Sequence, residues 1–293
     1  MTTVGNQVRE AFQFNILKLP LQGPDNMRTP HYGLFRSDNG DCLPTSVSSR
    51  FVPHTTEDVA VISEAASAGF DIPADRITVR ASWAKTGHRV CVRPDKDFRR
   101  SIHGTNDNIW PSLLIRADYG AAFTSSLSIF RDACKNLMML RKVEGTTVSI
   151  AHRGNFRDEF DALVGQFTYL AARFDSVVDV IHKLDDRKVA IADFLTHLYP
   201  VPEATSKSVV TRHRDKMQLL LNRLADERIK TGRDNPNDFA GEASLWELVN
   251  VVTGFVQHDS QVRGKLSKVE RAFRAADSRD CDKAWELAVT MAS

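Results

Sequence analysis

The strongest constraint on the fold is a change in apolar periodicity along the chain. In the first half, short segments rich in β-branched and aromatic residues alternate between apolar and polar positions, which is typical of strands. In the second half, apolar residues recur at spacings of three and four from Phe156 to Leu184, which predicts one long amphipathic helix. Because 42% of the 293 residues are hydrophobic, the chain can bury a core.

The first half is predicted to form a sheet with one packed helix. Residues 85–87 and 118–120 are turn-forming and lie between strand-like segments, so each predicts a hairpin. Thr55 starts a predicted helix that runs to Ala68 and ends at Gly69. The predicted strands are 12–19, 31–36, 76–83, 88–93, 112–118, 121–130 and 146–152.

The second half is predicted to be a helical bundle. Ser244 and Glu247 form a capping box at the start of one of its helices. The helices predicted after the long one are 188–198, 206–230, 244–258 and 264–291. The expected core side chains are Phe160, Phe167, Phe174, Trp246, Val249 and Phe255.

The expected fold class is therefore α+β. We expect an N-terminal, twisted, mostly antiparallel sheet with a packed helix, followed by a long helix and a C-terminal helical bundle. The boundary is placed near residue 153. It separates a strand-rich region, 1–153, from a helical region, 154–293, either as two parts or as one continuous domain.

Several functional classes lack their sequence signatures. There is no apolar run of about eighteen residues and no signal peptide, so we expect a cytoplasmic protein that does not contact membranes. The four cysteines include no CxxC pair, which argues against a zinc site or a disulfide framework. No nucleophile elbow, phosphate loop, dinucleotide fingerprint or HExxH motif occurs, so no catalytic residue, metal or cofactor is assigned.

A basic segment at 76–100 is the best functional candidate. The net charge is only +2, yet Arg80, Arg89 and Arg93 alternate with valines in two predicted strands of this segment. Since alternate strand residues point to opposite faces, one sheet face is expected to be basic while the other packs inside. The nearby aromatic residues either offer stacking surfaces to unpaired bases or belong to the core. They are Trp83, Phe98 and Trp110.

Three segments resemble a known family. Residues 129–137 hold an aromatic residue, Arg131, a cysteine and an asparagine, although Leu137 replaces the usual glycine. Residues 150–155 end a strand with His152 before a Gly-Asn pair, and 245–258 carry a tryptophan with downstream Asn, Thr and His. In this order and spacing they are similar to the domain of unknown function 932 family, also described as the phage/plasmid-like protein family.

The resemblance implies a mobile-element setting and no particular reaction. With the basic segment, it leads to the expectation of a non-sequence-specific, single-stranded DNA-binding protein. Strand annealing in a ring or filament of identical subunits would resemble phage annealing recombinases. The expected DNA-binding residues are Arg80, Lys85, Arg89, Arg93, Arg99 and Arg100, with Arg116, Arg131, Lys135, Arg141, Lys142 and Arg153 as a second tier.

Other interpretations stay open at this point. The main rival is an anti-restriction or anti-defence module that binds a host protein and has no enzymatic activity, and an enzyme of unknown class is another. The polar residues of the predicted helix 244–258 have two possible roles: they line a polar site, or they form hydrogen bonds between a core helix and neighbouring backbone groups. They are Asn250, Thr253 and His258. His152 and Arg153 either touch phosphate or cap the next helix.

Overall fold

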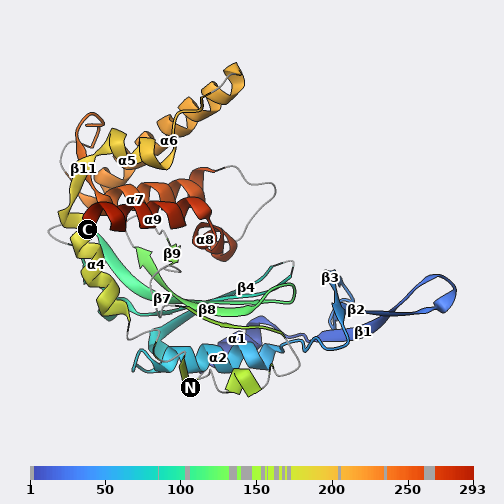
Figure 1. Ribbon diagram of the computed structural model, residues 1–293. Coiled ribbons are helices and arrows are strands. Elements are labelled where there is room, and N and C mark those ends of the chain that lie inside the picture. The colour runs from blue at the N-terminus through green and yellow to red at the C-terminus, as the bar shows by residue number, and fades with distance from the viewer. Residues whose placement is uncertain are drawn as a thin grey trace. The chain divides into compact units, whose positions relative to one another are not determined.

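The structure of the protein is a computed structural model that divides into two interleaved compact units (Figure 1). It describes residues 3–293 except for 85, 103–105, 132–136, 140–146, 153–155, 157, 162–164, 167–168, 170–172, 204–205, 234–235 and 261–267. The first unit holds Met1–Asp97, Ser112–Leu127 and Glu144–Arg173. The second unit holds Phe98–Pro111, Ser128–Val143 and Phe174–Ser293. This division follows spatial contacts, whereas the boundary near residue 153 separates strand-rich from helix-rich sequence.

Two helices and a small sheet begin the first unit. Helix α2 (Thr56–Ala68) has the predicted capping box, in which the Thr55 side chain accepts a hydrogen bond from the Asp58 amide. Helix α1 (Val4–Ala11) was not predicted. Its side chains at Val4 and Val8 are buried, and its first turn is capped by Thr3. A strand was predicted at 12–19, but the strand in this segment begins only at Ile16, after the helix has ended.

The small sheet is antiparallel, with strand order β1-β2-β3. Leu34, Leu43 and Val47 pack with Tyr119 in a buried cluster under it. Strands β1 and β2 form a long hairpin that extends away from α1 and α2 (Figure 1). The strands are β1 (Ile16–Gln22), β2 (Arg28–Arg36) and β3 (Cys42–Ser48).

The large sheet has the order β10-β8-β7-β5-β4, with β6 on β7 and β9 on β8. Strands β4 and β5 pair antiparallel around the predicted turn at 85–87. Gly87 is required there, because a Cβ atom would collide with the Ala117 carbonyl. The strands are β4 (Ile77–Ala84), β5 (Gly87–Pro94), β6 (Arg100–Ser101), β7 (Asn108–Asp118), β8 (Phe123–Arg131), β9 (Leu137–Met139) and β10 (Thr147–Ile150).

Helices α1 and α2 lie on the same side of β4 and β5 (Figure 1). On that side Val90, Val92 and Ile115 are buried. Phe12, which follows α1, meets the His88 ring edge-on with centroids 4.6 Å apart. Burial of this face fixes the register of the strands, since a slip by one residue would expose these side chains.

The second unit is mainly helical, and α7 lies at its centre in contact with α4, α6 and α9. All ten residues of α7 are buried. A two-stranded antiparallel pair, β11 with β12, joins the chain before α5 to the chain before α7. The elements are α4 (Phe174–Asp186), β11 (Lys188–Ala190), α5 (Ile191–Leu198), α6 (Lys207–Thr231), β12 (Glu242–Ser244), α7 (Leu245–Gly254), the π-helical turn η4 (Phe255–Asp259), α8 (Lys268–Ala276) and α9 (Arg279–Ala292).

Three predicted helices are divided in the structure. The described part of 156–184 is helical except for Arg173, which lies in a turn directly before α4, so the predicted helix is interrupted at this residue. The segment 188–198 begins with strand β11, and 264–291 is interrupted before Ser278, which caps α9. Apolar spacing reports which face of a helix is buried, and this spacing continues across a short break.

The core prediction is confirmed wherever the structure describes the residue. Trp246 and Val249 have no exposed surface, and Phe160, Phe174 and Phe255 are also buried. Phe167 lies outside the described residues. None of the helices that the structure describes combines the length and apolar character needed to cross a membrane.

Replacing Trp246 should destabilise the fold strongly. Its ring is buried, and its indole N–H donates to Asp107 Oδ2 at 3.0 Å. Trp246→Ala should lower the free energy of unfolding by about 3–5 kcal/mol. Trp246→Phe keeps most of the ring and loses the hydrogen bond, so it should cost about 1–3 kcal/mol. Urea unfolding checks both values, and a Trp246→Ala protein as stable as the wild type would contradict the burial.

Candidate nucleic-acid interface

Four arginines lie on one face of β4, β5 and β7. The alternation of side chains along a strand predicted this for Arg80, Arg89 and Arg93, and Arg116 lies beside them. Arg80 is opposite Cys91, Arg93 is opposite Thr78, and Arg89 is opposite both Ser82 and Arg116. Arg80 is exposed, whereas the other three are partly buried. We call this surface the basic face, defined by Arg80, Arg89, Arg93 and Arg116.

One carboxylate belongs to the basic face and orients part of it. Asp118 Oδ2 lies 2.8 Å from Arg89 Nη2 and 3.8 Å from Arg116 Nε. Its Oδ1 accepts a hydrogen bond of 2.6 Å from the Thr86 hydroxyl. The Arg89 and Asp118 side chains are only 11% and 10% exposed. Arg89 is therefore held in place by an ion pair that water reaches poorly.

The two arginines further along the hairpin surround Cys91. Burial raises the pKa of the Cys91 thiol, while the nearby guanidinium groups of Arg93 and Arg80 act in the opposite direction. Arg80 lies directly opposite Cys91, and Arg93 follows Cys91 by two residues on the same face of β5. Asp118 lies at the other end of that strand, opposite Gly87.

Arg99 and Arg100 belong to the second unit and follow the short 3-10 helix η3 (Lys96–Phe98). Both are exposed. The Arg99 guanidinium lies 6.0 Å from the centroid of the Trp110 ring. Arg100 Nη2 lies 3.2 Å from Asp175 Oδ1. Trp110 is buried, so the possibility that it offers a stacking surface is not supported.

Arg131 has an internal position. Its side chain is 3% exposed and lies 2.6 Å from Asp107 Oδ1, and it also forms an ion pair with Glu227. Strand β8 is buried on most of both faces, so alternation could not indicate that this arginine points inward. Arg131 therefore stabilises the core of the second unit and has almost no surface to offer a ligand.

The remaining predicted DNA-binding residues lie outside the part of the chain that the structure describes. They are Lys85, Lys135, Arg141, Lys142 and Arg153.

The polar residues of α7 have structural roles. Asn250 donates from Nδ2 to the Trp246 carbonyl at 2.8 Å, and Thr253 donates to the Val249 carbonyl at 2.9 Å. Both are buried, and both bond to their own helix. Of the two interpretations of this helix, the core interpretation is the one confirmed for these residues.

His152 links two separate segments of the first unit. Its Nδ1 lies 3.2 Å from the Val52 carbonyl and its Nε2 lies 3.0 Å from the Asp118 carbonyl. Burial lowers its pKa, and these two carbonyl groups act to raise it. Both ring nitrogens of His152 therefore face carbonyl oxygens of other segments.

Two further histidines join His152 in a buried aromatic cluster that sequence reasoning missed. His54 Nε2 lies 3.1 Å from His88 Nδ1, and the His54 ring stacks on Tyr119 with centroids 4.0 Å apart. His54 also stacks on His152 at 5.0 Å. No motif connects positions 54, 88 and 152, so only the folded arrangement brings these rings together.

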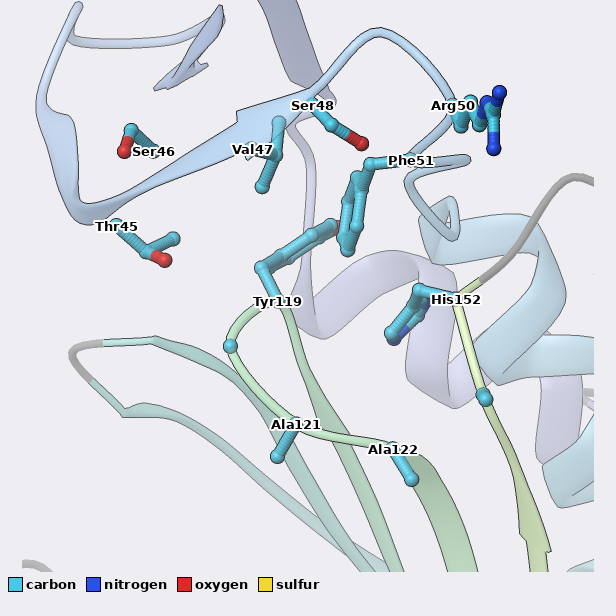
Figure 2. A pocket seen from close by; sticks show the side chains of 12 residues that line it. Thr45, Ser46, Val47, Ser48, Arg50, Phe51, Tyr119, Ala121, Ala122 and His152 are labelled. Carbon is cyan, nitrogen blue, oxygen red and sulfur yellow. The ribbon is translucent and has the colours of Figure 1, made fainter. Parts of the chain in front are cut away.

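A pocket of about 660 Å³ opens beside this cluster (Figure 2). Residues Thr45 to Ser48 of β3 form one wall, and the turn from Tyr119 to Ala122 forms another. The rest of the lining consists of Arg50, Phe51, Ala151 and His152, and the Phe51 and His152 rings lie 5.1 Å apart. In Figure 2, Phe51 points toward Tyr119, whereas Arg50 extends away from the pocket.

The comparisons with known proteins gave one match. The sequence profile of the family described as a domain of unknown function (DUF932) matches residues 45–281. The chain belongs to the DUF932 family. Neither the curated proteins nor the solved structures include a match to the chain.

Two of the DUF932-like segments meet in the structure. Arg131 comes from the first segment and Trp246 from the third, and both bind the buried carboxylate of Asp107. The DUF932 match also covers the basic face and the pocket. It begins within β3, so α1, β1 and β2 precede the matched region.

The buried His88 should make the fold sensitive to acid. Burial, with smaller effects of the Arg89 and Arg36 charges, lowers the pKa of His88 to about 3. An unfolded histidine has a pKa near 6.5, so the unfolded chain binds more protons between these values. The free energy of unfolding should therefore fall as the pH drops from about 6.5 to about 3, by up to about 1.4 kcal/mol per pH unit.

Unfolding of His88→Gln should depend less on pH across that window than unfolding of the wild type. His31 is exposed on β2, so His31→Gln serves as the matched control and should follow the wild type. Denaturant titrations at a series of pH values measure both. An unchanged pH dependence in His88→Gln would contradict the account.

Proposed function

We propose that this protein binds single-stranded DNA without sequence preference, through the basic face. The register of β4, β5 and β7 is the observation that carries the proposal, since it gathers Arg80, Arg89, Arg93 and Arg116 on one side of adjacent strands. Strand annealing in a ring or filament of identical subunits is the activity we propose for such a protein.

The side chains around these arginines favour contact with a polyanion. Their cross-strand neighbours Thr78, Ser82 and Cys91 have short side chains, and Arg80 is exposed, whereas the Arg89 and Arg116 side chains are 11% and 18% exposed. Among the strand residues that share the basic face, Asp118 is the acidic one, so the positive charges outnumber the negative ones. A protein with a net charge of +2 needs such local concentration of cations to hold DNA at physiological salt.

Arginine contacts to phosphate do not distinguish one base from another, which accounts for the expected lack of sequence preference. A single strand also exposes its bases, and base stacking on aromatic side chains adds affinity that duplex DNA cannot use. The aromatic pocket beside Asp118 supports a preference for single strands. No metal or nucleotide cofactor is required for this mode of binding.

The proposal is tested by the salt dependence of binding. Arg80→Ala combined with Arg93→Ala leaves the Arg89–Asp118 ion pair intact, and so avoids leaving Asp118 without its closest cation. The slope of log affinity against log salt should become shallower, by about 0.7 for each phosphate of a single strand that the variant no longer neutralises. Fluorescence anisotropy with a labelled, mixed-sequence oligonucleotide measures this slope.

Arg212→Ala with Arg214→Ala is the matched control. These two arginines are exposed on α6 in the second unit, and their removal changes the net charge equally. The control should retain the wild-type slope. If the Arg80/Arg93 variant is folded and keeps the wild-type affinity and slope, the basic face is not the binding site.

A host-protein-binding, anti-restriction module is the second candidate, and exposed apolar side chains favour it. Leu17 and Leu19 on β1 are 45% and 46% exposed, and Met27 near the end of the hairpin is 64% exposed. These residues precede the region that matches the DUF932 family. If the wild type binds no DNA even at about 50 mM salt, where phosphate contacts are strong, this candidate becomes the better explanation.

A further inference from the structure

We infer that the pocket beside Tyr119 holds one unstacked base of the bound single strand. This inference rests on the proposed function and adds a specific binding site for one base of the nucleic acid. All residues that line the pocket belong to the first unit, as does the basic face. The pocket and the basic face are therefore parts of one compact unit.

The lining of the pocket suits a planar heterocycle. Phe51 and His152 are partly buried, so each retains some exposed ring surface, while Tyr119 is almost completely buried beneath them. Thr45 Oγ1 faces Gly120 and can donate to or accept from the polar edge of any base. An apolar wall with a few polar groups is typical of sites for small aromatic ligands.

The charges around the pocket suit the phosphates of the same strand. Arg50 is exposed at the rim and extends away from the pocket, where a base inside would leave its phosphate (Figure 2). On the other side, His152 contacts the Asp118 carbonyl, and the Asp118 side chain holds Arg89. At the end of β7, Tyr119 therefore faces the pocket, while the Asp118 side chain faces Arg89 on the other side of the sheet. An apolar side chain of a protein partner would fill the pocket equally well but would form no ion pair with these cations.

Gly120 controls the space in the pocket. A Cβ atom at this position would lie 3.9 Å from Thr45 Oγ1, in ordinary van der Waals contact across the pocket. Gly120 does not have a positive φ angle, so other residues can adopt its backbone conformation. A larger side chain here would fill the pocket without straining the turn.

Gly120→Leu tests the inference, with Gly120→Ala as the matched control. The probes are an oligothymidylate of about 15 nucleotides and an abasic strand of the same length, both within the range of single-strand binding sites. The wild type and Gly120→Ala should bind the normal strand about tenfold more tightly than the abasic one. Gly120→Leu should bind both strands with the affinity of the wild type for the abasic strand.

Equal wild-type affinity for the two strands, with a steep salt dependence, would overturn the pocket and leave the proposed function intact. Absence of binding to both strands would overturn both proposals. Circular dichroism checks that Gly120→Leu is folded. If it is not, Phe51→Leu replaces it, since this change keeps an apolar side chain and removes the flat ring, and it should remove the same preference for bases.

Discussion

The packing of α1 and α2 against β4 and β5 determines which side chains of these two strands reach the other face of the sheet. Val90, Val92 and Ile115 have no exposed surface, and His88 is buried beside them. Because side chains alternate along a strand, these apolar contacts hold the arginines on the opposite side. The positive charge of the basic face is thus a consequence of hydrophobic packing. Gly87 maintains the same register by allowing β5 to approach Ala117 and Asp118 closely.

A second constraint operates in the helical unit, where Asp107 binds Arg131 and the Trp246 indole. A buried carboxylate is costly unless it is paired and hydrogen-bonded, and these two partners satisfy both of its oxygens. Removing Arg131 would take away an ion-pair partner of Asp107, and removing Trp246 would take away a hydrogen bond to Oδ2. Asp107 thus connects the two segments that carry Arg131 and Trp246.

Periodicity and capping predicted much of the fold, because both are local. The α+β class, helix α2 with its capping box, the hairpin of β4 and β5 and the burial of Trp246 all follow from neighbouring residues. The pairing of β11 with β12 depends on contacts between segments that are distant in the sequence. The same limit applies to the site: alternation predicted the basic face, whereas the inward position of Arg131 and the pocket beside Tyr119 arise only from tertiary packing.

The most direct test of the account is to map where single-stranded DNA crosslinks to the wild-type protein. Ultraviolet irradiation of the complex with an oligothymidylate, followed by mass spectrometry of the digested protein, identifies the peptides in contact with DNA. The account predicts crosslinked peptides from 78–93 and 112–122, together with the peptide that contains Phe51. Absence of crosslinks under low-salt conditions, or crosslinks confined to α6 and the other helices of the second unit, would contradict it.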